Sequence, residues 1–526
     1  MTSGAGINVL LITADQMRAD CLSAVGHPLV RTPHLDALAA DGALFTSHYS
    51  QCAPCGPSRT SLLTGMYQMN HRSVQNGTPL DAGFTNVAEM ARTAGYAPWL
   101  IGYTDTALDP RGHHPNDPGI AHYSGLLPGF QQYAAGSEHA SRDSDWLLHL
   151  RELGYENWRQ PHQQQAGFER EAREKGPSFA PIRLRAEHSD TAYSADRANR
   201  FIRQFAGRPW FLHLSFLRPH PPFVAPEPYH DMYRLEDVPP FAALPTIADE
   251  AAVHPYMPFR LDRLEMAPAL PLDGPHPDDN PAWRQARATY YGLVSEVDHH
   301  VGRIIDCLKE TGEYERTLIV FTSDHGEMLG DHWCWGKETP YDASVRVPLI
   351  IRAPGAGERG VRVSRFTEHV DVMPTILDYL GVEAPLQCDG RSLRGFVDGA
   401  PPPVWRDEAH WEYDFRSVLD GDADRLFGLS IDEMGLAVLR TATHKYVHFT
   451  GLPPLLFDLE HDPGELNNLA GSDAGREAML ALSQRMLSWR MAFNRRDLTG
   501  IRLHRGQQIA AAAERRLTFP STGRSS

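Results

Sequence analysis

Short runs of apolar residues, most of them followed at once by polar ones, recur along this chain. Residues 7–14 are apolar at nearly every position, as is typical of central strands in a parallel sheet. Comparable runs occupy residues 97–101, 210–217, 318–322 and 347–352. We expect each run to form a buried strand, because runs of this length suit a strand better than a helix.

Segments with apolar residues at helical spacing lie between these strands. Residues 32–42 fit a helix with Pro33 at its first position and Gly42 at its end. Residues 294–308 place apolar side chains three and four positions apart. Further helices are expected at residues 58–63, 86–94 and 370–380. Strands that alternate with helices favour a mostly parallel sheet covered on both faces.

Two long segments show neither pattern. Residues 110–188 are rich in Gly, His, Pro and Gln, and residues 224–280 are also rich in loop-forming residues. We expect both segments to be irregular, and the first to lie over the functional site.

The pattern changes after about residue 400. Short segments such as 437–440 and 445–449 suit a small antiparallel sheet, and residues 478–492 suit a helix. Residues 504–526 are polar, basic and partly Ala-rich. We predict three units, namely a large α/β domain at 1–400, a C-terminal subdomain at 401–490 and a tail or oligomerisation arm at 491–526.

The length and charge of the chain narrow its class. At 526 residues it exceeds what one hydrophobic core usually fills. Its 50 basic and 66 acidic residues give a formal net charge of −16, which argues against nucleic acid or an anionic membrane as a partner. A small anionic substrate stays compatible with this charge, because a metal ion and a few cations can reverse the local field.

Neither the cysteines nor the N-terminal residues indicate secretion. The six cysteines show no spacing typical of a disulfide framework. The first residues lack the basic segment of a signal peptide, and no apolar run of 18 residues occurs. We therefore expect a cytoplasmic protein.

Polar side chains follow two of the predicted strands. Asp15 and Gln16 come directly after the first strand, and Asp324 and His325 follow the fourth. The carboxyl ends of strands are where open α/β sheets bind ligands. Carboxylate and amide oxygens with one imidazole suit a divalent ion such as Ca²⁺, Mg²⁺ or Mn²⁺. Taken singly, each residue would fit a helix cap or a loop as well, so the prediction depends on the whole set.

A longer motif begins at Cys55. The run from Cys55 to Gly65 has proline at the second following position, arginine at the fourth, and closes on Leu-Thr-Gly. It resembles the signature of type I sulfatases and their phosphonate-cleaving relatives. The alternative is a buried structural thiol. Cys52 and Cys55 also form a C-x-x-C pair, but no second pair at zinc-ribbon spacing follows.

The resemblance extends over most of the chain. Further matching segments are Asp15-Gln16, Asp324–Glu327, Gly330–His332, Trp335–Lys337, Arg346–Ile351 and Leu456–Leu469. The similarity is greatest to the phosphonate monoester hydrolase and phosphodiesterase branch, through residues 69–76, 100–104, 218–224 and 446–449. It implies an alkaline-phosphatase/sulfatase-like α/β fold, with a mostly parallel central sheet flanked by helices in a catalytic domain and a smaller C-terminal antiparallel sheet.

The resemblance also implies a cofactor and a modified residue. In that family the cysteine is oxidised after synthesis to formylglycine by a formylglycine-generating enzyme. Carried over by position, one divalent ion would be held by Asp15, Gln16, Asp324, His325 and the modified Cys55. One hydroxyl of the hydrated aldehyde would attack phosphorus or sulfur of a small anionic ester. The other would then lose its proton, and the oxyanion would leave as the aldehyde re-forms.

Five more residues receive roles from the same resemblance. Arg59 would orient the diol, and His220 and Lys337 would contact substrate oxygens and protonate the leaving group. Asn76 and Tyr103 would hydrogen-bond the non-bridging oxygens. Each of the five also has a structural alternative, as a packed or surface side chain.

The chain departs from the family pattern at three positions. Many sulfatases carry Asp in place of Gln16 and Asn in place of His325, and the loss of one carboxylate would modestly ease the binding of an anionic ester. Asp105 stands where the hydrolase branch carries a hydroxyl residue, so it is a further candidate for substrate binding. Its carboxylate would repel a phosphoryl oxygen unless paired or turned away, and it could instead select a cationic or hydroxyl-bearing leaving group.

Three functions are compatible with these residues. The favoured one is a metal- and formylglycine-dependent hydrolase of phosphonate monoesters and phosphodiesters, with promiscuous sulfate-ester hydrolysis. The first alternative is a sulfatase acting on aryl, alkyl or sugar sulfates. The second is a catalytically silent binding protein with unmodified Cys55, against which the intact Arg59, His220 and Lys337 argue. By resemblance we also expect a homo-oligomer, a dimer or a tetramer.

Overall fold

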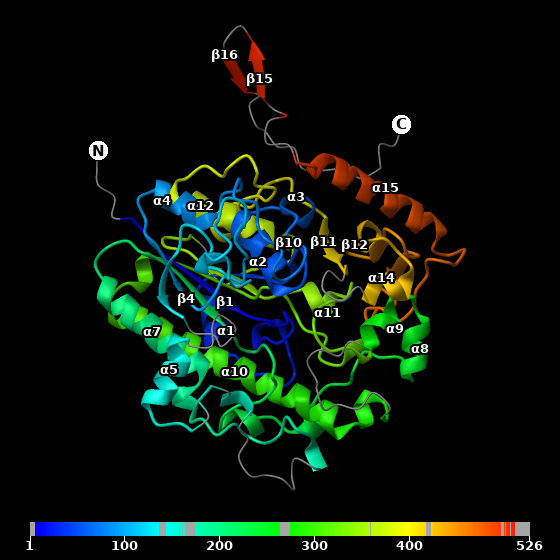
Figure 1. Ribbon diagram of the computed structural model, residues 1–526, viewed down its shortest axis with the longest axis horizontal. Helices are drawn as coiled ribbons and strands as arrows, with labels where there is room; N and C mark the ends of the chain where they lie inside the picture. Colours follow the sequence, from blue (N-terminus) through cyan, green and yellow to red (C-terminus); the bar gives the residue numbers. More distant parts are fainter. Residues whose placement is uncertain are drawn as a thin grey trace.

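An eight-stranded sheet runs through the body of the molecule (Figure 1). In spatial order its strands are β5 (Gln131–Ala134), β4 (Pro98–Ile101), β6 (Phe211–Phe216), β1 (Asn8–Ala14), β7 (Thr317–Thr322), β8 (Leu349–Arg352), β2 (Ala43–Phe45) and β9 (Val361–Val363). The first five are parallel, whereas β8 is antiparallel to both of its neighbours. The prediction of a mostly parallel central sheet is confirmed.

The computed structural model describes most of the chain. The described residues are 6–510 except 122, 136–143, 157, 160, 164–173, 263–273, 358, 417–421, 496–498, 500, 505 and 506.

Both faces of the sheet are buried, which explains why β1 is apolar throughout. Leu10 and Ile12 belong to one hydrophobic core and Val9 and Leu11 to the other, because successive side chains of a strand point to opposite faces. On one face lie α1 (Pro33–Ala40), α7 (Asp190–Phe205) and α10 (Pro281–Glu310); on the other lie α2 (Cys55–Thr64), α4 (Val87–Thr93) and α12 (Val372–Leu380) (Figure 1). This is the layered arrangement expected for alternating strands and helices.

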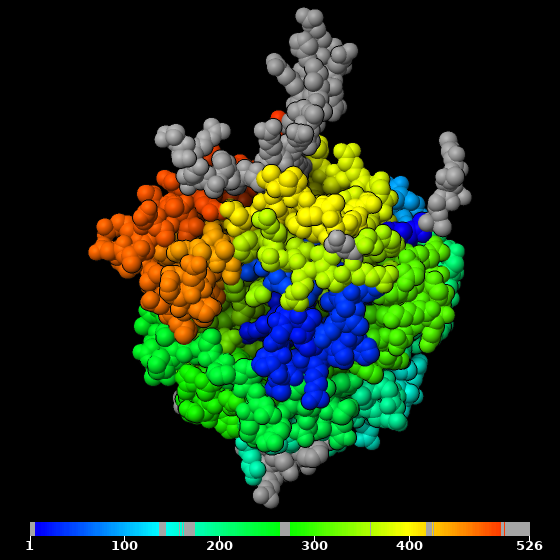
Figure 2. Space-filling view, turned by 180° about the vertical axis from the view of Figure 1, so that it is seen from behind, coloured from blue at the N-terminus to red at the C-terminus, as the bar shows by residue number. Residues whose placement is uncertain are grey.

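A second, smaller sheet follows in the C-terminal part. Its strands are β11 (Glu408–Asp414), β12 (Gly435–Thr441), β13 (His444–Phe449) and β14 (Leu455–Asp458), antiparallel in this order. Helix α15 (Arg476–Phe493) packs on it through Trp489 and Met486. This unit forms a lobe at one side of the body (Figure 2). The predicted small antiparallel sheet is confirmed.

The prediction of an irregular segment at residues 110–188 is wrong in part. Strand β5 lies within it and extends the central sheet at its edge, and α5 (Asp145–Glu152) packs through Trp146, Leu147 and Leu150. The sequence of β5 is Gln-Gln-Tyr-Ala, which carries no apolar run because an edge strand is only half buried. Parts of this segment lie outside the described residues.

Other boundaries also differ from expectation. Helix α10 begins at Pro281, thirteen residues before the first predicted position, and Asn280 caps it by accepting from the N–H groups of Ala282 and Trp283. Polar residues are buried in its first turns. Apolar residues alone do not mark the buried face there, so the hydrophobic pattern did not reveal these turns. Short helices occur at α3 (Gln68–His71), α8 (Ile247–Ala252), α9 (Tyr256–Leu261), α11 (Asp342–Val345), α13 (Arg394–Val397) and α14 (Asp422–Phe427), and β3 (His48–Tyr49) pairs with β10 (Thr367–Glu368).

The predicted tail contains a hairpin. Strands β15 (Ile501–His504) and β16 (Gln507–Ala510) pair with each other and project from the body beyond α15 (Figure 1). Residues 511–526 lie outside the described residues. Among the helices that the structure describes, none combines the length and apolarity needed to cross a membrane.

Candidate active site

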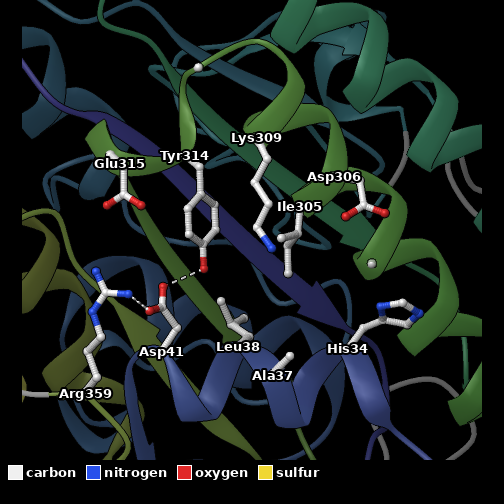
Figure 3. Close-up of a pocket in the computed structure, with 12 residues that line it drawn as sticks. His34, Ala37, Leu38, Asp41, Ile305, Asp306, Lys309, Tyr314, Glu315 and Arg359 are labelled. Carbon is white, nitrogen blue, oxygen red and sulfur yellow. Dashed lines mark hydrogen bonds and ion pairs between the residues drawn. The ribbon is translucent and has the colours of Figure 1, made fainter.

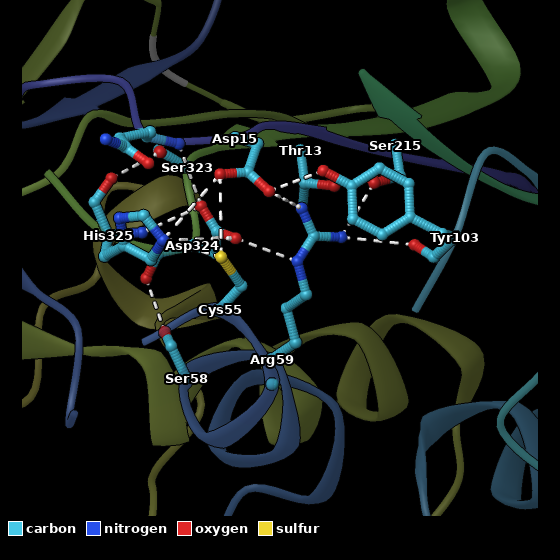
Figure 4. Close-up of polar contacts among 12 residues, drawn as sticks. Thr13, Asp15, Cys55, Ser58, Arg59, Tyr103, Ser215, Ser323, Asp324 and His325 are labelled. Atoms are coloured by element: carbon cyan, nitrogen blue, oxygen red, sulfur yellow. Dashed lines mark hydrogen bonds and ion pairs between the residues drawn. The ribbon is translucent and has the colours of Figure 1, made fainter. Parts of the chain in front are cut away.

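The polar residues that follow β1 and β7 come together because these strands are neighbours. Thr13 pairs with Thr322 in the parallel register, so Asp15 and Asp324 emerge side by side at the carboxyl edge of the sheet (Figure 4). Cys55 is the first residue of α2, and its side chain points at the same place. The structure thus brings together residues that are 310 positions apart in the sequence, Asp15 and His325.

A compact, buried group of potential metal ligands, the donor group, consists of Asp15, Cys55, Asp324 and His325. Their ligand atoms all lie within 4.8 Å of one another. The sulfur of Cys55 lies 3.1 Å from Nε2 of His325 and 3.9 Å from Oδ1 of Asp15. Burial, together with the neighbouring Asp324 carboxylate, raises the pKa of Asp15 to about 6. Buried negative charge concentrated in this way is a suitable environment for a cation.

The tautomer of His325 also fits a metal site. Its Nδ1 lies 2.9 Å from the carbonyl oxygen of Gly326, and because a carbonyl only accepts, Nδ1 carries the proton. Nε2 then presents its lone pair to the group, the arrangement found in metal-binding histidines. Burial lowers the pKa of His325, which favours this neutral form. The donor set therefore fits a divalent ion.

Gln16 lies at the edge of this group. Its side-chain oxygen accepts from Nζ of Lys337 at 2.8 Å, and its amide nitrogen donates to the carboxylate of Glu327. Its backbone N–H donates to Oδ1 of Asp324 at 3.0 Å. Gln16 has a φ of 68°, a left-handed conformation that is uncommon for such a residue and typical of functional sites.

Arg59 lies beneath the group and binds both carboxylates. Nε donates to Asp324 at 2.8 Å and Nη2 to Asp15 at 3.0 Å, while Nη1 donates to Ser215 and to the backbone of Tyr103 (Figure 4). The hydroxyl of Tyr103 donates to Asp15 at 2.5 Å. The structure thus places Arg59 and Tyr103 on the carboxylates, where their contacts orient the potential metal ligands.

Lys337 and His220 line the same cavity. Nζ of Lys337 donates to Gln16 and, at 3.2 Å, to the sulfur of Cys55. Burial alone would lower the pKa of Lys337, but the neighbouring Cys55 and Asp15 raise it, so the side chain is a fixed cation. The Nδ1 of His220 donates to the carbonyl oxygen of Pro221 at 2.7 Å.

The start of α2 explains the spacing of the Cys55 motif. Pro57 lies in the first helical turn, where its missing N–H removes no helical bond. A Cβ on Gly56 would lie 2.7 Å from the backbone oxygen of Asp105, so only glycine fits there. The N–H of Gly56 donates to Oδ1 of Asn76 at 2.8 Å, which leaves the amide NH₂ of Asn76 as the donor on the cavity side. The positive end of the helix therefore faces the site, where it favours an anion.

A cavity of about 340 Å³ opens onto Cys55. Its walls include Asp15, Cys55, Asn76, Tyr103, Asp105, His220 and Lys337, together with Pro54, Gln75, Tyr123, Glu338 and Tyr413. Seven of the residues that the sequence singles out thus face one space. Tyr413 comes from β11, so the small sheet contributes to the cavity. Tyr123, Glu338 and Tyr413 lie outside every motif and give no sequence signal, and Gln75 was not singled out within the matching segment 69–76, so these wall residues were not predicted.

Two further buried residues support the site and were also missed. Glu327 accepts from the side chain of Gln16 and from the N–H groups of Leu329 and Gly336. His369 donates from Nε2 to the carbonyl oxygen of Asp324 at 3.0 Å. Glu327 follows the matching Asp-His-Gly run, so its place in that motif was the available signal. His369 belongs to no motif that was singled out.

A larger cavity, of about 530 Å³, lies between α1 and α10 (Figure 3). Tyr314 borders it just before β7, whereas Asp324 follows the other end of that strand. It therefore lies toward the opposite edge of the sheet. Its Asp41 carboxylate accepts from Tyr314 at 2.8 Å and also binds Arg359, so this carboxylate is already paired.

Two family models match the chain. The model described as Sulfatase matches residues 7–382, and the model described as N-sulphoglucosamine sulphohydrolase, C-terminal, matches residues 330–492. The first match includes every site residue that was predicted from the sequence, and the second includes Tyr413.

Individual proteins are similar over nearly the whole length. The multifunctional alkaline phosphatase superfamily protein PehA of Trinickia caryophylli is 41% identical, over 94% of this chain and 97% of that protein. The crystal structure of the phosphonate monoester hydrolase of Agrobacterium radiobacter superposes with a TM-score of 0.89 at 44% identity, and the match covers 96% of this chain and 99% of that one. An arylsulfatase of Clostridium perfringens is 30% identical over 89% of this chain and 91% of that protein.

The fold, the buried donor group that includes Cys55, and these matches agree with one another. The chain belongs to the sulfatase family and is a hydrolase of ester bonds.

Proposed function

We propose that this enzyme hydrolyses phosphonate monoesters and phosphodiesters, with sulfate esters as secondary substrates, after Cys55 is converted to formylglycine. The observation that carries the proposal is the position of Cys55, whose side chain lies inside the buried donor group and within 3.2 Å of Lys337. A nucleophile on this side chain would be next to a bound cation. The name of the phosphonate monoester hydrolase at 44% identity supports the substrate class.

Asp15, Gln16, Asp324, His325 and residue 55 would hold one divalent ion, which we propose to be Mn²⁺, Ca²⁺ or Mg²⁺. The ion would supply positive charge that favours an ionised hydroxyl on residue 55, and the formylglycine hydrate would supply that hydroxyl. The side-chain oxygen of Gln16 now accepts from Lys337. To serve as a ligand, it would give up this hydrogen bond and bind the ion instead.

The chain's own cations bind and protonate the substrate. Lys337 lies beside residue 55 and would neutralise a non-bridging oxygen of the ester. The NH₂ group of Asn76 would donate to another. His220 has its Nδ1 committed to Pro221, so the protonated ring would give its Nε2 proton to the departing alkoxide. The helix terminus at Cys55 adds a favourable field for the anion.

Mass spectrometry of the peptide that contains residue 55 tests the proposal directly, because aldehyde and thiol differ in mass. We expect the rate of ester hydrolysis to scale with the converted fraction, and Cys55→Ala to be inactive. A preparation that carries only the thiol and yet turns over at full rate would contradict the proposal. If the measurements show both conversion of Cys55 and turnover, they also exclude the silent binding protein.

A sulfatase acting on aryl, alkyl or sugar sulfates is the second candidate, favoured by the arylsulfatase at 30% identity. Turnover of a phenylphosphonate ester, a phosphodiester and an aryl sulfate on one preparation separates the two. We expect kcat/KM to be higher for both phosphorus esters. A higher value for the sulfate would reverse the assignment.

We also propose a formylglycine-generating enzyme as maturation partner, a cytoplasmic location and a homo-oligomer, dimer or tetramer. The six cysteines form no disulfide with one another in the structure, which suits a reducing compartment. On α15, Leu480, Leu487 and Met491 are 61–69% exposed and lie on one face. The nearby two-stranded hairpin would be only marginally stable by itself. Both features suit contact with a second copy.

A further inference from the structure

Asp105 is a buried carboxylate in the active-site cavity that the reaction proposed above does not use. It is 5% exposed and lines the cavity with Cys55 and Lys337. Among the residues that the structure describes, no hydrogen bond or ion pair reaches its side chain. Its φ of 54° shows that the chain holds it in the left-handed conformation at this place.

The cations near Asp105 are committed elsewhere. Arg59 donates to Asp15 and Asp324, and Lys337 donates to Gln16 and Cys55. A carboxylate buried without a partner is costly, and such groups in native proteins generally pair with a ligand, an ion or water. Asp105 therefore offers a negative charge to whatever enters the cavity.

Two tyrosines stand on the walls of the same cavity. Tyr123 is 46% exposed and lies close enough to Asp105 that this carboxylate, after burial, contributes to raising its pKa to about 12. Tyr413 forms another part of the wall. Aromatic faces beside a carboxylate are the usual surroundings of an organic ammonium group. Of the other wall carboxylates, Asp15 accepts from Arg59 and Tyr103, and Glu338 has Arg260 at 3.6 Å.

We propose that this enzyme prefers esters that carry an organic ammonium group, bound by Asp105 with the rings of Tyr123 and Tyr413. The inference rests on the proposed ester hydrolysis and specifies its substrate class. The anionic centre of such an ester would lie at Lys337 and the donor group, and its cationic end at Asp105. The ammonium group belongs either to the substituent that stays on phosphorus or to the leaving alcohol.

Matched pairs of esters distinguish these two positions. For the retained side, 4-nitrophenyl phosphorylcholine is compared with 4-nitrophenyl 3,3-dimethylbutyl phosphate, its uncharged isostere. For the leaving side, the choline ester of phenylphosphonate is compared with the 3,3-dimethylbutyl ester. We expect kcat/KM to favour the cationic member of at least one pair by roughly tenfold, the size of a desolvated cation–π and ion-pair contact.

Substitutions assign that preference to residues. Asp105→Asn should abolish most of it, lowering kcat/KM for the cationic ester and raising it for the neutral one, because the repulsion of the phosphoryl oxygens is also removed. Glu338→Gln is the matched control within the cavity, since its charge is already paired, and it should change the ratio less. Tyr123→Leu should reduce the preference, whereas Tyr123→Phe keeps the ring and should retain it.

The proposal is overturned if both pairs give ratios near one in the wild-type enzyme, or if Asp105→Asn leaves a measured preference unchanged. Hydrolysis of the neutral esters in that case still supports the proposed function. If no ester is hydrolysed, the proposed function fails, and calorimetric titration with tetramethylammonium decides the inference separately. Binding that Asp105→Asn weakens supports the ammonium site, and equal or absent binding refutes it.

Discussion

At the scale of single residues, Arg59 is the side chain with the most connections in the site. It donates to Asp15, Asp324, Ser215 and the backbone of Tyr103. These contacts occupy the guanidinium, so its main action is to hold two potential metal ligands in place. Residues that hold metal ligands in this way commonly contribute tenfold to a hundredfold to metal affinity or activity.

Arg59→Lys should therefore weaken metal binding by roughly tenfold to a hundredfold. A lysine offers a single charge and cannot form the same pair of contacts with Asp15 and Asp324. Titration with a chelator, followed by metal analysis, measures the change. Much of the lost activity should return at high metal concentration, while Arg92→Lys on α4 should bind metal normally. Unchanged metal affinity with a lower kcat would show that Arg59 acts on the substrate instead.

At the scale of elements, the turn after β6 carries His220 and is held by a buried arginine. Nη1 of Arg218 donates to the carbonyl oxygens of His220 and Pro222 at 2.8 and 2.9 Å. Nε of Arg218 also lies 3.5 Å from Asp190, the first residue of α7. The position of His220 in the cavity thus depends on α7, through the contact between Asp190 and Arg218.

Arg218→Lys should lower kcat for esters of poorly acidic alcohols by roughly tenfold or more, since a displaced His220 transfers its proton less well. Esters of 4-nitrophenol need little protonation and should lose much less. A plot of rate against leaving-group pKa for the two enzymes makes the comparison. Equal losses across the series would mean that Arg218 supports the fold and not the proton transfer.

Helix α10 contains a buried acid that should make stability depend on pH. Glu296 accepts from Ser189 at 2.5 Å, and burial, aided by Asp190, raises its pKa from 4.5 to about 8. The folded protein therefore binds this proton more tightly than the unfolded chain. The resulting contribution to stability is complete below about pH 4.5 and is lost as the pH rises through about 8.

Glu296→Gln should remove that dependence. Its free energy of unfolding relative to the wild type should rise by on the order of 3 kcal/mol between pH 5 and pH 9. Denaturant unfolding at both pH values, with the exposed Glu315→Gln as control, measures the difference. A constant difference between the two proteins would show that Glu296 is ionised throughout.

The elements also show what the sequence could and could not predict. Strand β1 and helix α12 were recognisable because both are uniformly or periodically apolar. Strand β5 was not, since its four residues are mostly polar and lie at the sheet edge. In the site, the motif around Cys55 indicated the residue that lies inside the buried group of potential metal ligands. No pattern indicated Tyr413, because it reaches the cavity through the packing of a separate sheet.

At the scale of the whole molecule, the C-terminal lobe both completes the cavity and presents a surface to its surroundings. Tyr413 of β11 lines the cavity, and β11 also meets the segment before α2 through the bridge between Cys52 and Glu412. On its outer side, α15 carries the exposed stripe of Leu480, Leu487 and Met491. Contiguous exposed apolar side chains usually mark an interaction surface.

Truncation after Arg495 should therefore lower the molar mass in solution, because it removes the hairpin that follows α15. Leu487→Glu should act in the same direction by placing a charge in the stripe. Ser488→Glu, on the same helix but off the stripe, should leave the mass unchanged. Light scattering coupled to size-exclusion chromatography measures all four proteins. A full-length protein that is already monomeric would contradict the proposed assembly.

Cys55 is only 4% exposed and lies under the ends of two strands that the chain supplies more than 300 residues apart. An enzyme that modifies Cys55 must bind the segment around it. That segment is inaccessible once the two strands have formed and cover it. The aldehyde that we propose would therefore be made on the nascent or unfolded polypeptide, and a molecule that folds with the thiol at residue 55 would keep the thiol. Supplying the maturase to folded thiol protein should convert none of it, whereas the same mixture should mature chains released from denaturant.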